Sequence, residues 1–164
     1  MIFRVPRTFQ SVLRTSVASL LLAPTVLTGS ARAASDVETA QALPAATKLE
    51  ADSYLVEITP LGPYKAREDG NVKVTLTTKG VFHVNAQYPY RFKTAAPPAG
   101  VSYPKPVLER ADGQFAEKTA TFQLPFVANH AGTFEVGGVL HMSVCSPNSC
   151  IVQKAPLDVS VNVR

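Results

Sequence analysis

Apolar and polar positions alternate with a period of two along most of the chain beyond residue 50. Short runs of β-branched and aromatic residues carry this alternation, and Gly, Pro and Asn interrupt it at intervals of about 8–15 residues. Successive side chains of a strand point to opposite faces, so the pattern predicts half-buried β-strands. Seven strands are expected, over residues 53–59, 71–79, 81–86, 102–109, 117–127, 132–145 and 151–163.

The same region shows no apolar stripe with the period of a helix, and 13 prolines in the chain disfavour long helices. About seven to eight short strands in a stretch of this length are typical of an all-β, immunoglobulin-like antiparallel β-sandwich. The tryptophan and the widely spaced cysteines of antibody domains are absent. The expected similarity to immunoglobulin domains is therefore one of architecture.

The first 33 residues have the composition of an export signal. Three arginines precede a short apolar run over residues 16–28, and Ala31-Arg32-Ala33 supplies the small residues that signal peptidase recognises. The run is shorter than the roughly 20 apolar residues of a spanning helix. We therefore predict cleavage between Ala33 and Ala34, with an uncleaved anchor as the alternative. The mature protein is expected to be exported, to a periplasm or as a secreted protein.

This export signal accounts for the net charge of the chain. The sequence has 16 basic and 12 acidic residues, a formal charge of +4 at pH 7. Four arginines lie in residues 1–33, which contain no acidic residue, so 12 basic and 12 acidic residues remain. No basic run follows, so no nucleic-acid partner is implied. Residues 34–48 predict a flexible lead-in, followed by one domain over 49–164 without a membrane span.

The last two expected strands flank the only cysteines, Cys145 and Cys150, and predict a β-hairpin. If the two cysteines face each other, the numbers of all paired residues sum to 295, as 145 and 150 do. In this register one face of the hairpin is nearly all apolar, whereas the other is mostly polar. Both cysteines fall on the polar face, so we expect them at the open end of the sandwich, outside its core.

The cysteines are separated by Ser146-Pro147-Asn148-Ser149, a sequence of turn-forming residues. In an oxidising compartment such a pair is expected to form a disulfide. One interpretation is a structural staple, which contributes about 2 kcal/mol for so short a loop. The other is thiol–disulfide exchange, which needs an accessible sulfur and a resolving cysteine. His141 and Lys154 lie four residues away, about 13 Å along a strand, and receive no catalytic role.

The segment over residues 132–163 resembles the end of the N-terminal periplasmic domain of the bacterial thiol:disulfide interchange protein DsbD. The shared features are a strand that ends in Cys145, a short turn, Cys150, and a closing strand of alternating residues. The motifs FHVNAQYPYRFK, at 82–93, and ATFQLPFV, at 120–127, also suit that domain. The resemblance extends over about residues 50–163, nearly the whole of the expected domain.

The resemblance implies a redox-active cysteine pair that exchanges electrons with another envelope protein, such as a thioredoxin-fold oxidoreductase or a membrane electron donor. Tyr88, Pro89, Tyr90 and Phe92 would then resemble the aromatic cap loop that shields the pair, with ordinary packing at a loop edge as the alternative. The activity would be of the protein-disulfide reductase type. The alternative function is a non-enzymatic binding or adaptor domain in which the disulfide only staples the hairpin.

Other chemistry finds little support in the sequence. The three histidines, His83, His130 and His141, lack the short spacing of a metal site, although with the cysteines they include ligands that suit copper or zinc. We therefore expect no metal and no cofactor. No glycine-rich phosphate loop and no Gly-x-Ser-x-Gly motif is present, and the acidic residues are scattered singly, so a hydrolase is not expected.

Overall fold

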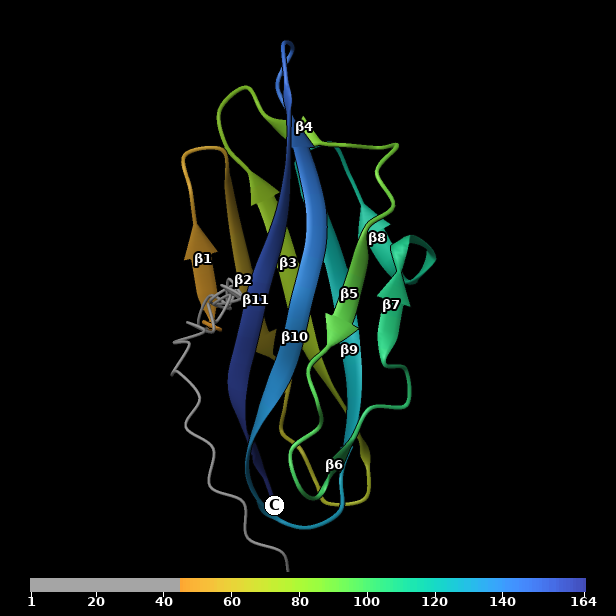
Figure 1. The fold of residues 1–164 in the computed structure, drawn as a ribbon. Coiled ribbons are helices and arrows are strands. Elements are labelled where there is room, and N and C mark those ends of the chain that lie inside the picture. The colour runs from red at the N-terminus through yellow and green to blue at the C-terminus, as the bar shows by residue number, and fades with distance from the viewer. Residues whose placement is uncertain (1–44) are drawn as a thin grey trace, which may run out of the picture. The chain divides into compact units, whose positions relative to one another are not determined.

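The structure is a computed structural model that describes residues 45–164, in which two antiparallel β-sheets pack face to face (Figure 1). The first sheet has the order β1-β2-β3-β9-β6, with β8 paired to β9. Its strands are β1 (Lys48–Glu50), β2 (Tyr54–Pro60), β3 (Asp69–Thr78), β6 (Val101–Ser102), β8 (Gly113–Phe115) and β9 (Thr119–Ala128). The predicted all-β sandwich is confirmed.

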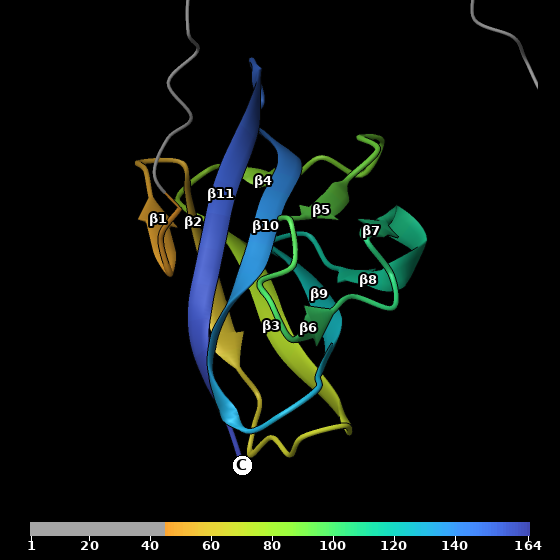
Figure 2. The same ribbon diagram turned by 60° about the horizontal axis from the view of Figure 1, so that its bottom comes forward.

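The second sheet has the order β11-β10-β5-β7, with β4 paired to β10. Its strands are β4 (His83–Val84), β5 (Arg91–Thr94), β7 (Val107–Glu109), β10 (Gly132–Cys145) and β11 (Cys150–Val163). A single 3₁₀ turn, η1 (Arg110–Asp112), joins β7 to β8. In both views β10 lies between β11 on one side and β5 on the other (Figure 2). The long β10–β11 hairpin is therefore the main element of this sheet.

The core forms where the alternating apolar residues of the two sheets meet. On the first sheet, every second side chain of β3 and β9 is buried, including Val72, Val74, Leu76, Phe122, Leu124 and Phe126. On the second sheet, the matching set on β10 and β11 includes Val136, Leu140, Met142, Leu157, Val159 and Val161. This is the face of the hairpin that the sequence predicted to be apolar and buried.

The eleven strands exceed the seven expected from the sequence, because one predicted strand is divided in two and the short strands β1, β5 and β8 were not predicted. The predicted strand over 102–109 is divided into two short strands, β6 and β7, and both Pro104 and Pro106 lie between them. Proline lacks the N–H that a continuous ladder requires, which explains the division. The predicted strand over 81–86 is reduced to the two residues of β4, and the four-residue β5 was not predicted.

The predicted export signal, its cleavage site at Ala33 and Ala34, and the lead-in up to residue 44 lie outside the described residues. The end of the lead-in contacts the sandwich. Ala46 forms a parallel bridge with Leu157, and β1 begins at Lys48, so sheet pairing starts slightly before the expected domain boundary at residue 49. Within residues 45–164, no helix has the length and apolar character needed to cross a membrane.

Candidate functional site

The disulfide between Cys145 and Cys150 closes the tip of the β10–β11 hairpin, and the Cα atoms of the two cysteines lie 4.0 Å apart. All fourteen pairs of the hairpin follow the predicted register, from Gly132 opposite Val163 to Cys145 opposite Cys150. The tip projects past the neighbouring loops at that end of the sandwich (Figure 1). Both cysteines lie on the face opposite the core, as the register predicted, but Cys145 is buried there and not exposed as expected.

The turn between the cysteines is held by its own hydrogen bonds. The backbone N–H of Ser146 donates to the carbonyl of Ser149 at 2.8 Å. The hydroxyl of Ser146 donates to the same carbonyl at 3.2 Å and accepts from the N–H of Ser149 at 3.2 Å. These bonds close a tight turn without help from the sulfur atoms, so the geometry of the tip does not depend on the disulfide alone.

The two cysteines differ in exposure to solvent. Only 6% of Cys145 is exposed, because it ends a strand that has neighbours on both sides. Cys150 is exposed, because it begins β11, which is an edge strand of the sheet. An incoming thiolate must approach the sulfur atom it attacks from solvent. The exposed Cys150 sulfur is therefore the accessible half of the bond, and Cys145 is the protected half.

His83 occupies the position beside Cys145 on the side away from Cys150. The β4–β10 pair places His83 opposite Cys145 and Val84 opposite Val144. Directly opposed residues of an antiparallel pair project to the same face, with Cβ atoms about 4.5–5.5 Å apart. Val84 is buried in the core, so His83, which is half-buried, points to the face that carries the disulfide. The row across the sheet is thus His83, Cys145 and Cys150.

No pattern in the sequence indicates that His83 lies beside Cys145. The alternation over residues 81–86 predicted a strand, but the partner of a two-residue strand is set by tertiary packing. His141 and Lys154 oppose each other four residues back from the tip, as the register predicted. They are about 13 Å along the strands from the cysteines. His83 is therefore the histidine that lies beside the disulfide.

The four aromatic-loop residues proposed from the resemblance lie in different environments. Tyr90 and Phe92 are buried in the core, Tyr88 is partly buried, and Pro89 is exposed. The rings of Tyr88 and Tyr90 meet edge to face at a centroid distance of 5.2 Å. Tyr90 is linked to the cysteine strand, because its hydroxyl donates to the carbonyl of Ser143. This loop therefore packs against the end of β10 behind the disulfide.

Basic side chains gather on the outward face below the disulfide. Arg91 and Lys154 flank His141 across β5, β10 and β11, and Lys93 lies opposite Val139. Arg91, Lys93 and Lys154 are exposed, and none of them takes part in an ion pair within residues 45–164. We call these three residues the basic face.

His141 lies between Arg91 and Lys154 of the basic face but carries less charge than they do. Partial burial lowers the pKa of His141, and the positive charges of Lys154, Arg91 and Lys93 lower it further. The imidazole is consequently neutral at pH 7. The electrostatic attraction of this face for acidic groups therefore comes from the lysines and the arginine.

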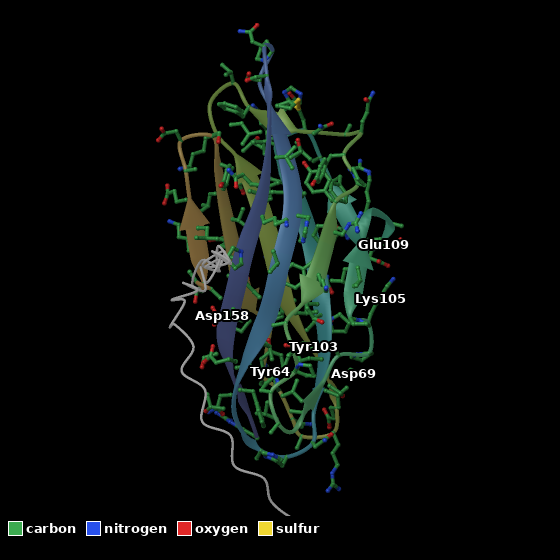
Figure 3. The ribbon with its side chains drawn as sticks, in the orientation of Figure 1. Tyr64, Asp69, Tyr103, Lys105, Glu109 and Asp158 are labelled. Atoms are coloured by element: carbon green, nitrogen blue, oxygen red, sulfur yellow. A yellow bond between two sulfur atoms is a disulfide. The ribbon has the colours of Figure 1, made fainter. Side chains whose placement is uncertain are left out.

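Two shallow pockets meet at Arg110, beside β4 and β5. One, of about 600 Å³, is lined by residues that include Tyr90, Glu109 and Arg110. The other, of about 340 Å³, is lined by residues that include His83, Arg110 and Glu117. Neither pocket is lined by a cysteine. Glu109, which lines the larger one, lies at the β7 edge of the sheet (Figure 3).

The disulfide lies outside both pockets, on a projecting tip, and this shape is suited to contact with another protein.

Within the described part of the chain, no group of three or more His, Cys, Asp or Glu residues is arranged to hold a metal ion. His130 lies in the loop between β9 and β10, where its ring packs at a tilt against the ring of Phe134, with the centroids 5.2 Å apart. The chain matches no protein-family model and no curated protein.

Proposed function

We propose that this domain is an exported thiol–disulfide exchange module whose redox centre is the Cys145–Cys150 disulfide. The observation that carries the proposal is the asymmetry of the bond, with an exposed Cys150 on a projecting tip and a buried Cys145 behind it. Exchange through a mixed disulfide uses one sulfur that a partner reaches and one that is released and later resolves the intermediate. The resemblance to the N-terminal domain of the DsbD family supports the same role.

The reaction proceeds in two displacement steps. A partner thiolate attacks the sulfur of Cys150, a new S–S bond forms between the partner and Cys150, and the Cys145 sulfur leaves with the electron pair of the broken bond. A second partner thiolate then attacks the partner's sulfur in the mixed disulfide and releases Cys150 as a thiolate. Two electrons have moved to this domain and the partner leaves as a disulfide. The protons that the partner thiols released on ionising are balanced by those that the Cys145 and Cys150 thiolates take up. The reverse sequence oxidises the domain and reduces a partner disulfide.

A purely structural role explains the geometry less well. The hairpin already has fourteen cross-strand pairs, and its turn has an independent set of hydrogen bonds. A disulfide that closes a six-residue loop adds about 2 kcal/mol in chain-entropy terms. The fold therefore has little need of a covalent link at this position, whereas an exchange reaction requires one that is exposed.

The surroundings of Cys150 indicate what a partner would present. Val152, two residues from Cys150 on the same face, is 60% exposed and offers an apolar contact. The basic face begins beyond it at Lys154. A protein with an accessible cysteine beside an apolar contact and an acidic rim would fit this surface. A thioredoxin-fold oxidoreductase or a membrane electron donor of the envelope are the classes of partner we propose.

The reduction potential of the disulfide tests the proposal. The measurement equilibrates the domain with graded dithiol and disulfide buffers and traps the free thiols. A potential of about −120 to −270 mV, the range of exchange proteins, is the expected result. A potential below about −300 mV is that of a structural disulfide and would replace this proposal with the binding or adaptor domain.

A further inference from the structure

We infer that His83 is the proton donor and acceptor for Cys145 during disulfide exchange, a role that rests on the proposed function. The carrying observation is the register of β4 against β10, which sets His83 directly opposite Cys145. The two side chains project to the same face, with Cβ atoms about 4.5–5.5 Å apart. An imidazole on a Cβ at this separation reaches a sulfur atom of the opposing residue.

The position also suits the sulfur that needs a proton. Cys145 is 6% exposed, so solvent has limited access to its sulfur when the disulfide opens. His83 is half-buried and lies opposite Cys145 in the register, between solvent and the row of cysteines. Histidine is the side chain best suited to exchange protons between pH 5 and 8. It therefore connects a protected thiolate with bulk water.

The charged groups around His83 come from two segments, η1 and the loop between β8 and β9. Glu117 and Arg110 line the same pocket as His83, with opposite charges. The ammonium group of Lys118 donates to the carbonyls of Gly80 and Phe82, just before β4. The imidazole thus has charges of both signs near it, and His83 remains partly exposed to solvent. The only titratable partner opposite it on β10 is Cys145.

The proton balance follows the displacement described above. When a partner thiolate attacks Cys150 and the S–S bond breaks, Cys145 leaves as a thiolate, and protonated His83 transfers its proton to that sulfur. His83 becomes neutral and regains a proton from water. In the oxidising direction, neutral His83 accepts the proton of the Cys145 thiol. The resulting thiolate attacks the mixed disulfide at Cys150, and the partner leaves as a thiolate.

The test measures the rate at which dithiothreitol reduces the disulfide between pH 5.5 and 8.5, with each rate divided by the concentration of dithiothreitol thiolate. In the unaltered domain we expect this normalised rate to rise as the pH falls. In His83→Gln we expect a flat profile, with a rate at pH 6 about tenfold lower. Positioned proton donors contribute about 10²–10⁴-fold in enzymes, and water replaces part of that effect at a half-buried site.

Two further variants separate a proton-transfer role from a structural one. His141→Gln alters a histidine on the same face, four residues from Cys145, and should keep the profile of the unaltered domain. His83→Lys keeps a cation throughout the pH range, so its normalised rate should be flat and higher than that of His83→Gln. Equal thermal unfolding midpoints for all variants would exclude a folding defect as the cause.

The outcomes for His83 and for the proposed function are read from different measurements. A flat profile in the unaltered domain, or the same sloping profile in His83→Gln, would overturn the role of His83 whatever the potential of the disulfide. A potential below about −300 mV would overturn the proposed function, because the pair would then be a structural disulfide. An exchange-range potential with an unchanged His83→Gln profile would leave the proposed function standing without His83.

Discussion

The hydroxyl of Tyr90 donates a hydrogen bond to the backbone carbonyl of Ser143, two residues before Cys145. The backbone N–H of Asn85 donates to the same hydroxyl at 3.1 Å, and its side-chain amide donates to the hydroxyl of Ser143 at 3.2 Å. Ser143 is fully buried, so these bonds satisfy polar groups that water does not reach. Burial raises the pKa of Tyr90, which keeps its hydroxyl protonated as a donor. The loop before β5 thereby fixes the end of the cysteine strand.

Replacing Tyr90 with Phe should lower the free energy of unfolding by about 1–2 kcal/mol, because the buried groups around Ser143 lose a partner. Urea unfolding measures this change. Tyr88→Phe is the matched control, since the Tyr88 hydroxyl makes no hydrogen bond within residues 45–164 and should cost little. Equal losses in the two variants would mean that ring packing, and not the hydrogen bond to Ser143, holds this loop to β10.

The unequal exposure of the two cysteines predicts unequal reactivity. Cys145→Ser leaves the exposed Cys150 as a free thiol, and Cys150→Ser leaves the buried Cys145. With a bulky aromatic disulfide reagent at pH 8, the Cys150 thiol should react about tenfold faster or more, because the reagent must reach the sulfur. Absorbance of the released thiolate follows both reactions. Faster reaction of Cys145 would reverse the order of attack proposed above.

The sequence predicted the hairpin well because its information is local. Fourteen successive pairs follow from one assumption, that Cys145 faces Cys150, since an alternating strand tolerates no shift of one residue without exposing its apolar face. The buried face, from Val136 to Val144, follows for the same reason. The long strands β3 and β9 were likewise close to their predicted ranges, because their alternation continues over ten residues each.

The candidate site depends on contacts that the sequence pattern does not contain. β4 has two residues and β5 has four, so neither has enough alternation to reveal the strand it pairs with. The positions of His83 beside Cys145 and of Arg91 beside His141 both come from these pairings. Ser143 was expected on an outward polar face and is buried, because the Asn85 loop covers that end of β10.

Gly138 allows β10 to approach β5 closely. A Cβ atom at this position would overlap the backbone carbonyl of Lys93, and one at Gly137 would overlap that of Leu157 on β11. Gly138→Ala should therefore push β5 from β10 and lower the free energy of unfolding by about 1–3 kcal/mol. Chemical denaturation measures the loss. The control is Val139→Ala, at the adjacent half-exposed position, which should lower the free energy of unfolding by less than about 1 kcal/mol. A loss in Gly138→Ala smaller than the loss in Val139→Ala would contradict the close approach of the strands.

The basic face should select among small thiols by charge. Glutathione carries a net negative charge and cysteamine a positive one, so the ratio of their reduction rates, each per thiolate, reports the potential near Cys150. Lys154→Glu should lower the glutathione-to-cysteamine ratio by about threefold at low ionic strength, and 1 M salt should remove the difference. Taking a ratio cancels any effect of the substitution on the reactivity of the disulfide itself.

Lys73→Glu provides the control for this charge test. Lys73 is exposed on β3, in the other sheet, so its reversal changes the net charge of the domain equally but far from the hairpin. The thiol ratio should remain that of the unaltered domain. If both reversals lowered the ratio alike, the selection would reflect net charge, and the basic face would lose its proposed part in partner binding.

The lowered pKa of His141 makes a prediction about acid stability. Its causes, largest first, are burial and the charges of Lys154, Arg91 and Lys93, all of which disfavour the imidazolium in the folded domain. The unfolded chain therefore binds a proton at this site more readily, and the free energy of unfolding falls as the pH drops from the ordinary value of 6.5 through the folded pKa. His141→Gln should lose less stability than the unaltered domain between pH 7 and pH 5, as measured by urea unfolding. Lys154→Met should raise the pKa of His141 in an NMR titration, and an unchanged value would mean that the charge of Lys154 does not contribute to the shift.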